Sequence, residues 1–151
     1  MMSWIFQGNP KVFRVDEYLQ RYKTITWTIR QKHFKDEISV GDEVYIWRSD
    51  GDQPRSGGIV AKGKILSFPQ EMEDDAPDLW IKKQENSFAL RSKIEVEDVR
   101  LVEEEGMLKR VDLERDDNIK DIRILVFRYE INYKLEPKHA HHIRDLWQHK
   151  K

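Results

Sequence analysis

Short runs in which polar residues alternate with β-branched and aromatic residues are the feature that most constrains the fold of this chain. Residues 24–29 read TITWTI and residues 43–48 read EVYIWR. Successive side chains of a strand point to opposite faces, so Trp27 is expected to share one buried face with Ile25 and Ile29. The two runs therefore predict strands that each bury one face.

The remaining patterns predict a mainly β domain with a few peripheral helices. Apolar residues at helical spacing predict helices at 15–22 and 137–147, and a broken helical pattern covers 107–120. Turn-forming residues at 50–58 and acidic, proline-bounded residues at 69–78 are expected to be loops. Further strands are predicted at residues 3–7, 59–66 (bent at its interior glycine), 79–83, 93–102 and 131–135. This irregular order predicts an α+β fold, a small barrel or strongly bent sheet of six or seven strands.

Length and composition indicate one intracellular domain. The 151 residues suit a single core spanning 1–151, and the absence of cysteine excludes disulfides, thiol catalysis and Cys-ligated zinc. Residues 1–9 lack the pattern of a signal peptide, and no segment approaches the roughly 20 apolar residues that span a bilayer. The expected compartment is the cytoplasm, without a membrane partner. Since 27 basic and 28 acidic residues nearly cancel, any contact with nucleic acid must be local.

No catalytic or metal-binding motif stands out. The glycines at 57, 58 and 63 fit neither the Walker pattern nor the dinucleotide fingerprint, and Gly-x-Ser-x-Gly and His-Glu-x-x-His are absent. Three histidines lie within residues 139–142, but no carboxylate or cysteine beside them completes a ligand set. We therefore expect no catalytic residue, no metal and no cofactor.

Aromatic residues lie beside hydrogen-bonding residues in three places. These groups are Trp4 with Gln7 and Asn9, Trp27 with Arg30 and Gln31, and Tyr45 with Trp47, Arg48 and Ser49. Such side chains suit a nucleobase, which is held by ring contacts worth about 1–3 kcal/mol each and by hydrogen bonds to its edge. The alternative is that the tryptophans are core residues, which is the more common role for any single one.

At these residues the chain resembles the EVE domain, a member of the PUA-like group that also includes the YTH and ASCH domains. The resemblance covers nearly the whole chain and rests on the order and spacing of its pieces. These are Trp4 with the Asn9–Pro10 turn, residues 27–31 (WTIRQ), 41–49 (GDEVYIWRS) and 57–63 (GGIVAKG). The chain differs from the common pattern at Gln31, where asparagine is frequent, and at 46–49, where a Tyr-His-Ser-like ending is frequent.

The resemblance implies a PUA-like bent β pseudo-barrel with flanking short helices and an aromatic cage for a modified base. That base is often a methylated cytosine in DNA, or a base in RNA. By carry-over, the residues expected at the pocket are Trp27, Trp47 and Ser49, with Trp4, Asn9, Arg30 and Gly58 nearby. Basic residues that gather in this region are expected to contact backbone phosphates, and they are Lys32, Lys35, Arg48 and Arg55.

The expected function is a non-catalytic reader that binds DNA or RNA with a modified base flipped into the pocket. One alternative is a protein-interaction or adaptor module of a defence or modification system, with partners from a restriction or modification system. Its contact surface would be the acidic segment 71–78 or the C-terminal helix. The other alternative is a nucleoside-processing enzyme on the same scaffold.

Overall fold

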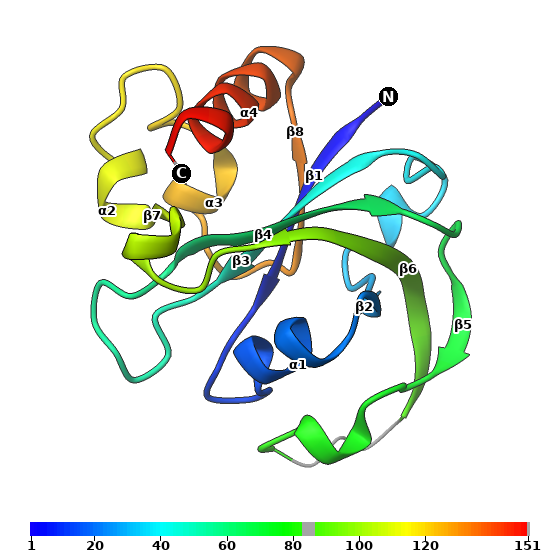
Figure 1. The fold of residues 1–151 in the computed structure, drawn as a ribbon. Helices are drawn as coiled ribbons and strands as arrows, with labels where there is room; N and C mark the ends of the chain where they lie inside the picture. The colour runs from blue at the N-terminus through cyan, green and yellow to red at the C-terminus, as the bar shows by residue number, and fades with distance from the viewer. Residues whose placement is uncertain (83–86, 151) are drawn as a thin grey trace.

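A single curled sheet organises the protein, as the computed structural model shows for residues 1–82 and 87–150 (Figure 1). Its strands are β1 (Ser3–Gly8), β2 (Thr24–Thr28), β3 (Glu43–Arg48), β4 (Gly58–Ile65), β5 (Gln70–Glu73), β6 (Phe88–Val99), β7 (Leu108–Lys109) and β8 (Asn132–Leu135). The α-helices are α1 (Val15–Arg21), α2 (Arg110–Leu113), α3 (Arg123–Val126) and α4 (Pro137–Lys150). Short 3-10 turns occupy η1 (Lys32–Phe34), η2 (Pro77–Leu79) and η3 (Glu103–Glu105).

The sheet follows the order β2-β6-β4-β3-β1-β8, with β5 paired to β6 and β7 paired to β4. Only β1 and β3 run parallel among these pairs of described strands. The β4–β6 register shifts between Lys62 and Gly63. A Cβ at Gly63 would lie 2.4 Å from the Glu95 carbonyl oxygen, so only glycine allows β6 to approach this closely. The bend predicted at this glycine is therefore present.

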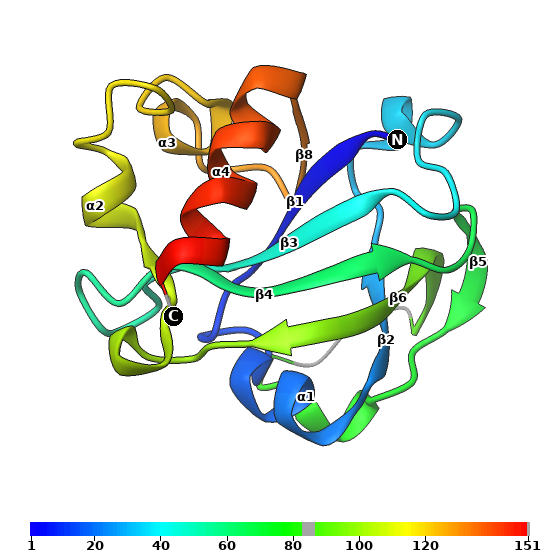
Figure 2. The same cartoon turned by 45° about the horizontal axis from the view of Figure 1, so that its top comes forward.

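Two hydrophobic cores lie on the two sides of the sheet. In β3, Val44 and Ile46 pack in the core that contains α1, whereas Tyr45 and Trp47 pack in the core that contains α4. Figures 1 and 2 show α1 inside the curve of the sheet and α2, α3 and α4 gathered on its other side. The strand alternation predicted from the sequence thus divides the aromatic residues between two separate environments.

The predicted bent sheet with short flanking helices is confirmed, with eight strands in place of six or seven. Two predictions were wrong in detail. The acidic segment 69–78 is not only a connection, because Gln70–Glu73 forms β5 on the edge of β6. The strand predicted at 79–83 is reduced to one isolated bridge between Trp80 and Phe13, since Pro77 starts a 3-10 turn; Lys83 lies outside the described residues.

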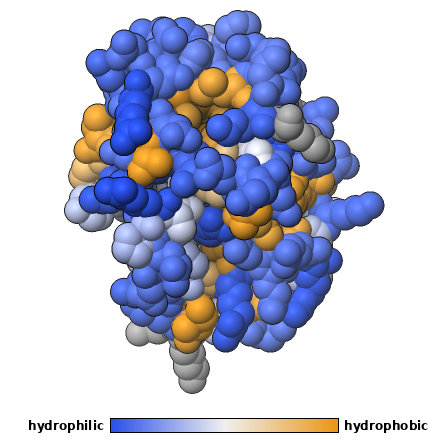
Figure 3. Space-filling view, turned by 60° about the vertical axis from the view of Figure 1, so that its left-hand side comes forward, coloured by the Kyte–Doolittle hydropathy of each residue, from blue (hydrophilic) through white to orange (hydrophobic). Residues whose placement is uncertain are grey.

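The surface is mainly hydrophilic on the face shown in Figure 3, where apolar residues form small separate patches. In the part of the chain that the structure describes, none of the helices has the length and apolar character needed to cross a membrane.

Candidate functional site

One pocket, of about 320 Å³, lies on the α1 side of the sheet and has aromatic walls. Its lining comes from the end of β1 and the loop after it, from α1, from β2 and the residues after it, from β6, and from the segments on either side of η2 and before β8. The lining residues are Gln7, Gly8, Asn9, Val12, Phe13, Tyr18, Thr26, Trp27, Thr28, Arg30, Asp74, Asp75, Trp80, Arg91 and Ile131. Two other hollows, of about 400 and 520 Å³, have Tyr22 as their single aromatic lining residue among those described. The aromatic pocket is therefore the candidate site.

The aromatic walls of the pocket are fixed by packing and by one hydrogen bond. Trp27 Nε1 donates to the carbonyl oxygen of Gln7 at 3.2 Å. The ring of Phe13 lies 4.6 Å from the ring of Trp80 and 5.0 Å from that of Tyr18, measured between centroids. These contacts hold the rings in place before any ligand binds, which lowers the entropy cost of binding.

Gly8 is required for the position of the Trp27 ring. A Cβ at Gly8 would lie 2.9 Å from Val15 Cγ2 and 3.0 Å from Trp27 Cζ2, closer than carbon atoms pack. The missing side chain lets the indole of Trp27 lie against the end of β1.

A hydrogen-bonded group of Tyr18, Thr26 and Asp75 forms one polar side of the pocket. Tyr18 Oη donates to Asp75 at 2.7 Å and accepts from the backbone N–H of Thr26 at 2.7 Å. Burial, together with the nearby Asp75 carboxylate, raises the pKa of the Tyr18 hydroxyl far above its usual value. Tyr18 therefore stays protonated, and its hydrogen bond holds the carboxylate of Asp75 in the wall of the pocket.

Arg91 places a cation in the pocket wall with most of its donors unused. The residue is 3% exposed and lines the pocket from β6. Its Nη1 donates to Thr28 Oγ1 at 3.3 Å, but Nε and Nη2 are buried without a hydrogen-bond partner among the described residues. Trp80 Nε1 is unpartnered in the same way. Each unsatisfied buried donor costs about 1–3 kcal/mol, so this wall of the pocket suits a ligand that offers hydrogen-bond acceptors.

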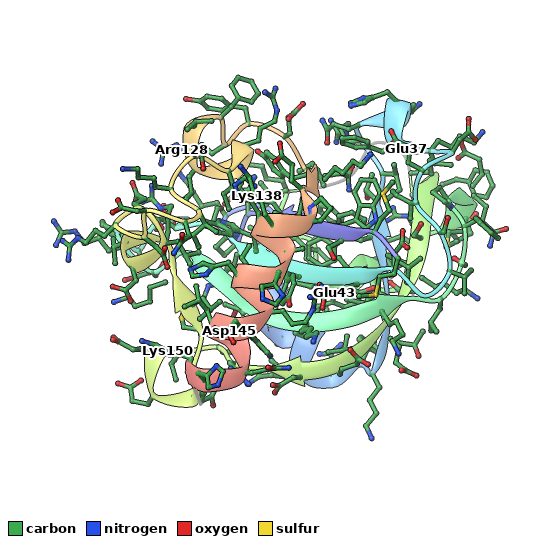
Figure 4. All side chains as sticks on the ribbon, turned by 90° about the horizontal axis from the view of Figure 1, so that it is seen from above. Glu37, Glu43, Arg128, Lys138, Asp145 and Lys150 are labelled. Carbon is green, nitrogen blue, oxygen red and sulfur yellow. The ribbon has the colours of Figure 1, made fainter. Side chains whose placement is uncertain are left out.

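Three side-chain amides fix the rim of the pocket. Asn132 Oδ1 accepts from the backbone N–H of Arg30 at 2.8 Å, and Gln31 Oε1 accepts from that of Asn132 at 2.8 Å. Gln7 Nε2 donates to the carbonyl oxygens of Arg128 and Glu130 at 3.2 and 2.7 Å. The exposed Arg30 and the loop that carries Arg128, labelled at the edge of the molecule in Figure 4, are thereby held beside the pocket.

Of the residues predicted at the pocket, the structure brings together Trp27, Asn9 and Arg30. Trp4 does not line it, because its indole is fully buried and Nε1 donates to Asp42 Oδ2 at 2.9 Å. Trp47 lies in the core on the other side of the sheet.

Ser49 and Gly58 are also outside the lining, although Ser49 touches its border through a backbone hydrogen bond to the Gly8 carbonyl oxygen at 2.9 Å. Gly58 has a φ of 150°, and a Cβ there would lie 2.1 Å from the Leu108 carbonyl oxygen. Glycine is therefore needed at residue 58 for the β4–β7 pairing and not for a ligand.

The predicted phosphate contacts divide into exposed and buried residues. Lys32, Lys35 and Arg55 are exposed, although Arg55 lines a different hollow. Arg48 is 8% exposed and donates to Asp16 at 3.0 Å and to the carbonyl oxygens of Leu101 and Ser56. Its guanidinium is already occupied inside the protein and holds α1 to the sheet.

Sequence reasoning missed Phe13, Tyr18, Asp75, Trp80 and Arg91 as pocket residues. No sequence signal was present at Arg91, because the burial of this charged residue follows only from the pairing of β6 with β2 and β5. The other four also carried no local signal of a site.

Comparisons with known proteins agree with this architecture. A hypothetical protein from Leishmania major is 15% identical with a TM-score of 0.69, covering 98% of this chain and 95% of that one. Human THYN1, solved in complex with 5-methylcytosine-containing DNA, is 13% identical with a TM-score of 0.66 and complete coverage of both chains. The YTH domain of Zygosaccharomyces rouxii MRB1, solved with N6-methyladenosine RNA, is 11% identical with a TM-score of 0.59, covering 99% and 89%. Curated protein sequences yield no match.

The curled sheet with short flanking helices is thus the fold of the PUA-like domains. Within that class the chain belongs to the EVE domain family, whose sequence model matches residues 2–146. The resemblance inferred from the sequence is confirmed.

Two histidines of α4 lie against aspartate side chains. His142 Nε2 lies 2.7 Å from Asp116 Oδ2, and His139 Nε2 lies 3.5 Å from Asp121 Oδ1. Over residues 1–82 and 87–150, His, Cys, Asp and Glu form no group of three or more that could hold a metal ion. These histidines join α4 to the segment that precedes α3.

Proposed function

We propose that this chain binds nucleic acid and reads a modified base, flipped into the aromatic pocket, without catalysing a reaction. The observation that carries the proposal is the combination of aromatic walls with unused buried donors in a cavity of about 320 Å³. A flipped base needs ring contacts on its faces and hydrogen bonds along its edge. Phe13, Trp27 and Trp80 provide the first, and the side chains of Asp75 and Arg91 provide the second.

The base is a 5-methylcytosine type in DNA or a modified base in RNA. Support comes from proteins of similar fold, because human THYN1 is solved with 5-methylcytosine-containing DNA and the MRB1 YTH domain with N6-methyladenosine RNA. The partner is the DNA or RNA itself. Proteins of a restriction or modification system are proposed as further partners.

The surface beside the pocket suits a nucleic-acid backbone. Arg30 on the rim is exposed, and Lys32 and Lys35 follow it in and after η1. The Gln7 side chain donates to the carbonyl oxygen of Arg128 and so holds a second exposed loop beside the pocket. This loop carries Arg128 and Tyr129, and Tyr129 is 80% exposed. Arginine and lysine bind phosphates, and an exposed ring stacks on a neighbouring base. Arg55 remains a proposed phosphate contact, whereas Arg48 is withdrawn because its donors are occupied.

The test is fluorescence-polarisation binding at two fixed salt concentrations. Matched DNA and RNA oligonucleotides carry cytosine, 5-methylcytosine, 5-hydroxymethylcytosine or N6-methyladenine at one position. Trp27→Leu removes a pocket ring, and Trp47→Leu is the matched control, since it removes a buried tryptophan outside the pocket. Both variants are first checked for folding by circular dichroism and thermal unfolding.

We expect one modified base to be preferred, with a loss of about 5- to 150-fold in Trp27→Leu, which corresponds to 1–3 kcal/mol of stacking. The folded Trp47→Leu variant should keep the preference. Equal or absent binding across the whole panel would refute the reader function. A loss confined to Trp47→Leu would instead support the prediction that Trp47 belongs to the site.

A further inference from the structure

We propose that Arg91 reads the edge of the bound base and selects a base with two adjacent hydrogen-bond acceptors, as cytosine has in O2 and N3. This inference rests on the proposed function, since it takes the pocket to hold a base. It goes further by naming the residue that identifies the ring and the chemical class of that ring.

The starting point is a buried cation without a counterion. Arg91 is 3% exposed, and no carboxylate within the described residues forms a salt bridge with it. A buried charge is unfavourable unless it is paired and hydrogen-bonded. An arginine in this state at a pocket wall is therefore matched to something that enters the pocket.

The two unused donors form one edge of the guanidinium. Nε–H and one N–H of Nη2 point in parallel on the side away from Nη1, which is the group held by Thr28 Oγ1 at 3.3 Å. Such an edge binds two neighbouring acceptors at once, as it does in carboxylates and in bases. The position is also rigid, because Arg91 pairs with Thr28 of β2 on one side and with Gln70 of β5 on the other.

Base chemistry separates the possible ligands. Cytosine presents O2 and N3 side by side as acceptors, followed by the N4 amino group. Thymine and uracil carry a donor at N3, and adenine places its N6 donor beside N1. None of these three bases therefore offers two adjacent acceptors. Guanine also offers two adjacent acceptors, O6 and N7, with the N1–H donor beside O6, so it is the competing base that the experiment has to include.

The carboxylates of the pocket favour a base such as cytosine over a simple anion. Asp74 and Asp75 line the same cavity as Arg91. A carboxylate accepts from the N4 amino group of cytosine, whereas it repels a phosphate. The C5 position of cytosine lies on the opposite side of the ring from O2, so a 5-methyl group points away from Arg91 toward the other walls of the pocket. Arg91 thus identifies the ring, and the walls read its modification.

The experiment compares Arg91→Met, which keeps the length of the side chain, and Arg91→Lys, which keeps the charge but not the paired donors. Each is measured by fluorescence polarisation against oligonucleotides with 5-methylcytosine, N6-methyladenine, thymine or guanine at one position. We expect the wild type to prefer 5-methylcytosine. Both variants should lose at least 10-fold in affinity for it and lose the cytosine-over-adenine preference.

Thermal unfolding without ligand separates a recognition role from a structural one. Arg91→Met should be as stable as the wild type or more stable, because it removes an unpaired buried charge. A large loss of stability with unchanged relative affinities would overturn the assignment, and so would a wild-type preference for N6-methyladenine. Stabilisation by inorganic phosphate alone, lost in Arg91→Met, would identify an anion site and equally overturn it.

The outcome also distinguishes this inference from the proposed function. If the wild type prefers a modified base and Trp27→Leu loses that preference while Arg91→Met keeps it, the pocket reads bases but Arg91 does not select them. If no modified base is preferred by the wild type, the proposed function fails and this inference fails with it.

Discussion

Glu43 is a buried carboxylate at the junction of β1, β3, β4 and α4, and the change Glu43→Gln tests how much its ion pair stabilises the fold. The side chain is 5% exposed and accepts from Arg144 Nε and Nη2 at 2.9 Å each and from Ser3 Oγ at 2.9 Å. Lys62 Nζ lies 3.5 Å away. Figure 4 shows Glu43 on the sheet beneath α4.

The expected loss at pH 7 is about 2–3 kcal/mol in the free energy of unfolding. Glutamine keeps one acceptor but turns an amide N–H toward the two donors of Arg144. Breaking a buried pair by removing one partner costs about 3–5 kcal/mol. The Arg144 side chain is 30% exposed, so water recovers part of that loss.

The loss should also depend on pH. Burial raises the pKa of Glu43. Hydrogen bonds from Arg144 and Ser3 and the charges of Arg144 and Lys62 lower it by more than burial raises it, so the net shift is downward. A depressed folded-state pKa stabilises the protein above the unfolded-state pKa of about 4.3, and that stabilisation disappears as the pH falls through the folded-state pKa. The difference between wild type and Glu43→Gln should therefore be largest near neutral pH and shrink below about pH 4.

Urea unfolding followed by circular dichroism between pH 3 and 8 measures both effects. Glu97→Gln is the control, because Glu97 makes an exposed pair with Lys64 at 3.9 Å, with side chains 37% and 54% exposed. That pair should contribute less than about 1 kcal/mol. The reasoning is refuted if Glu43→Gln and Glu97→Gln are equally stable, or if the loss in Glu43→Gln is the same at every pH.

Three further changes probe the parts of the fold that position the site. Arg48→Met removes the bonds to Asp16 and two carbonyl groups and should lower unfolding stability by about 2–4 kcal/mol in urea, while leaving the salt dependence of nucleic-acid binding unchanged. Gly58→Ala forces a Cβ to within 2.1 Å of the Leu108 carbonyl oxygen and should cost at least about 3 kcal/mol, visible as a thermal transition lowered by at least about 6 °C. Asn132→Ala leaves two backbone N–H groups of the rim without an acceptor and should cost about 1–3 kcal/mol; hydrogen exchange at residues 30 and 31 should rise, and unchanged exchange would contradict this role.

The sequence determined the local structure of this protein because strand alternation is a property of neighbouring residues. Residues 24–29 and 43–48 correctly predicted β2 and β3, and the opposite faces of β3 were also correct. The spacing of motifs along the chain was sufficient to identify the EVE family. Part of the site was predictable for the same reason, since Asn9, Trp27 and Arg30 lie close to turns and strand ends that the sequence marks clearly.

Only the tertiary structure decided which aromatic and charged residues share the pocket. Trp27 and Trp47 occupy equivalent-looking positions in two alternating runs, but the curl of the sheet places them in different cores. Trp80 and Arg91 meet Trp27 because β6 pairs with β2 and the Trp80 segment bridges back to Phe13. Such contacts depend on how distant strands pair and on which face of the curled sheet is enclosed, and neither is encoded in the pattern of any single strand.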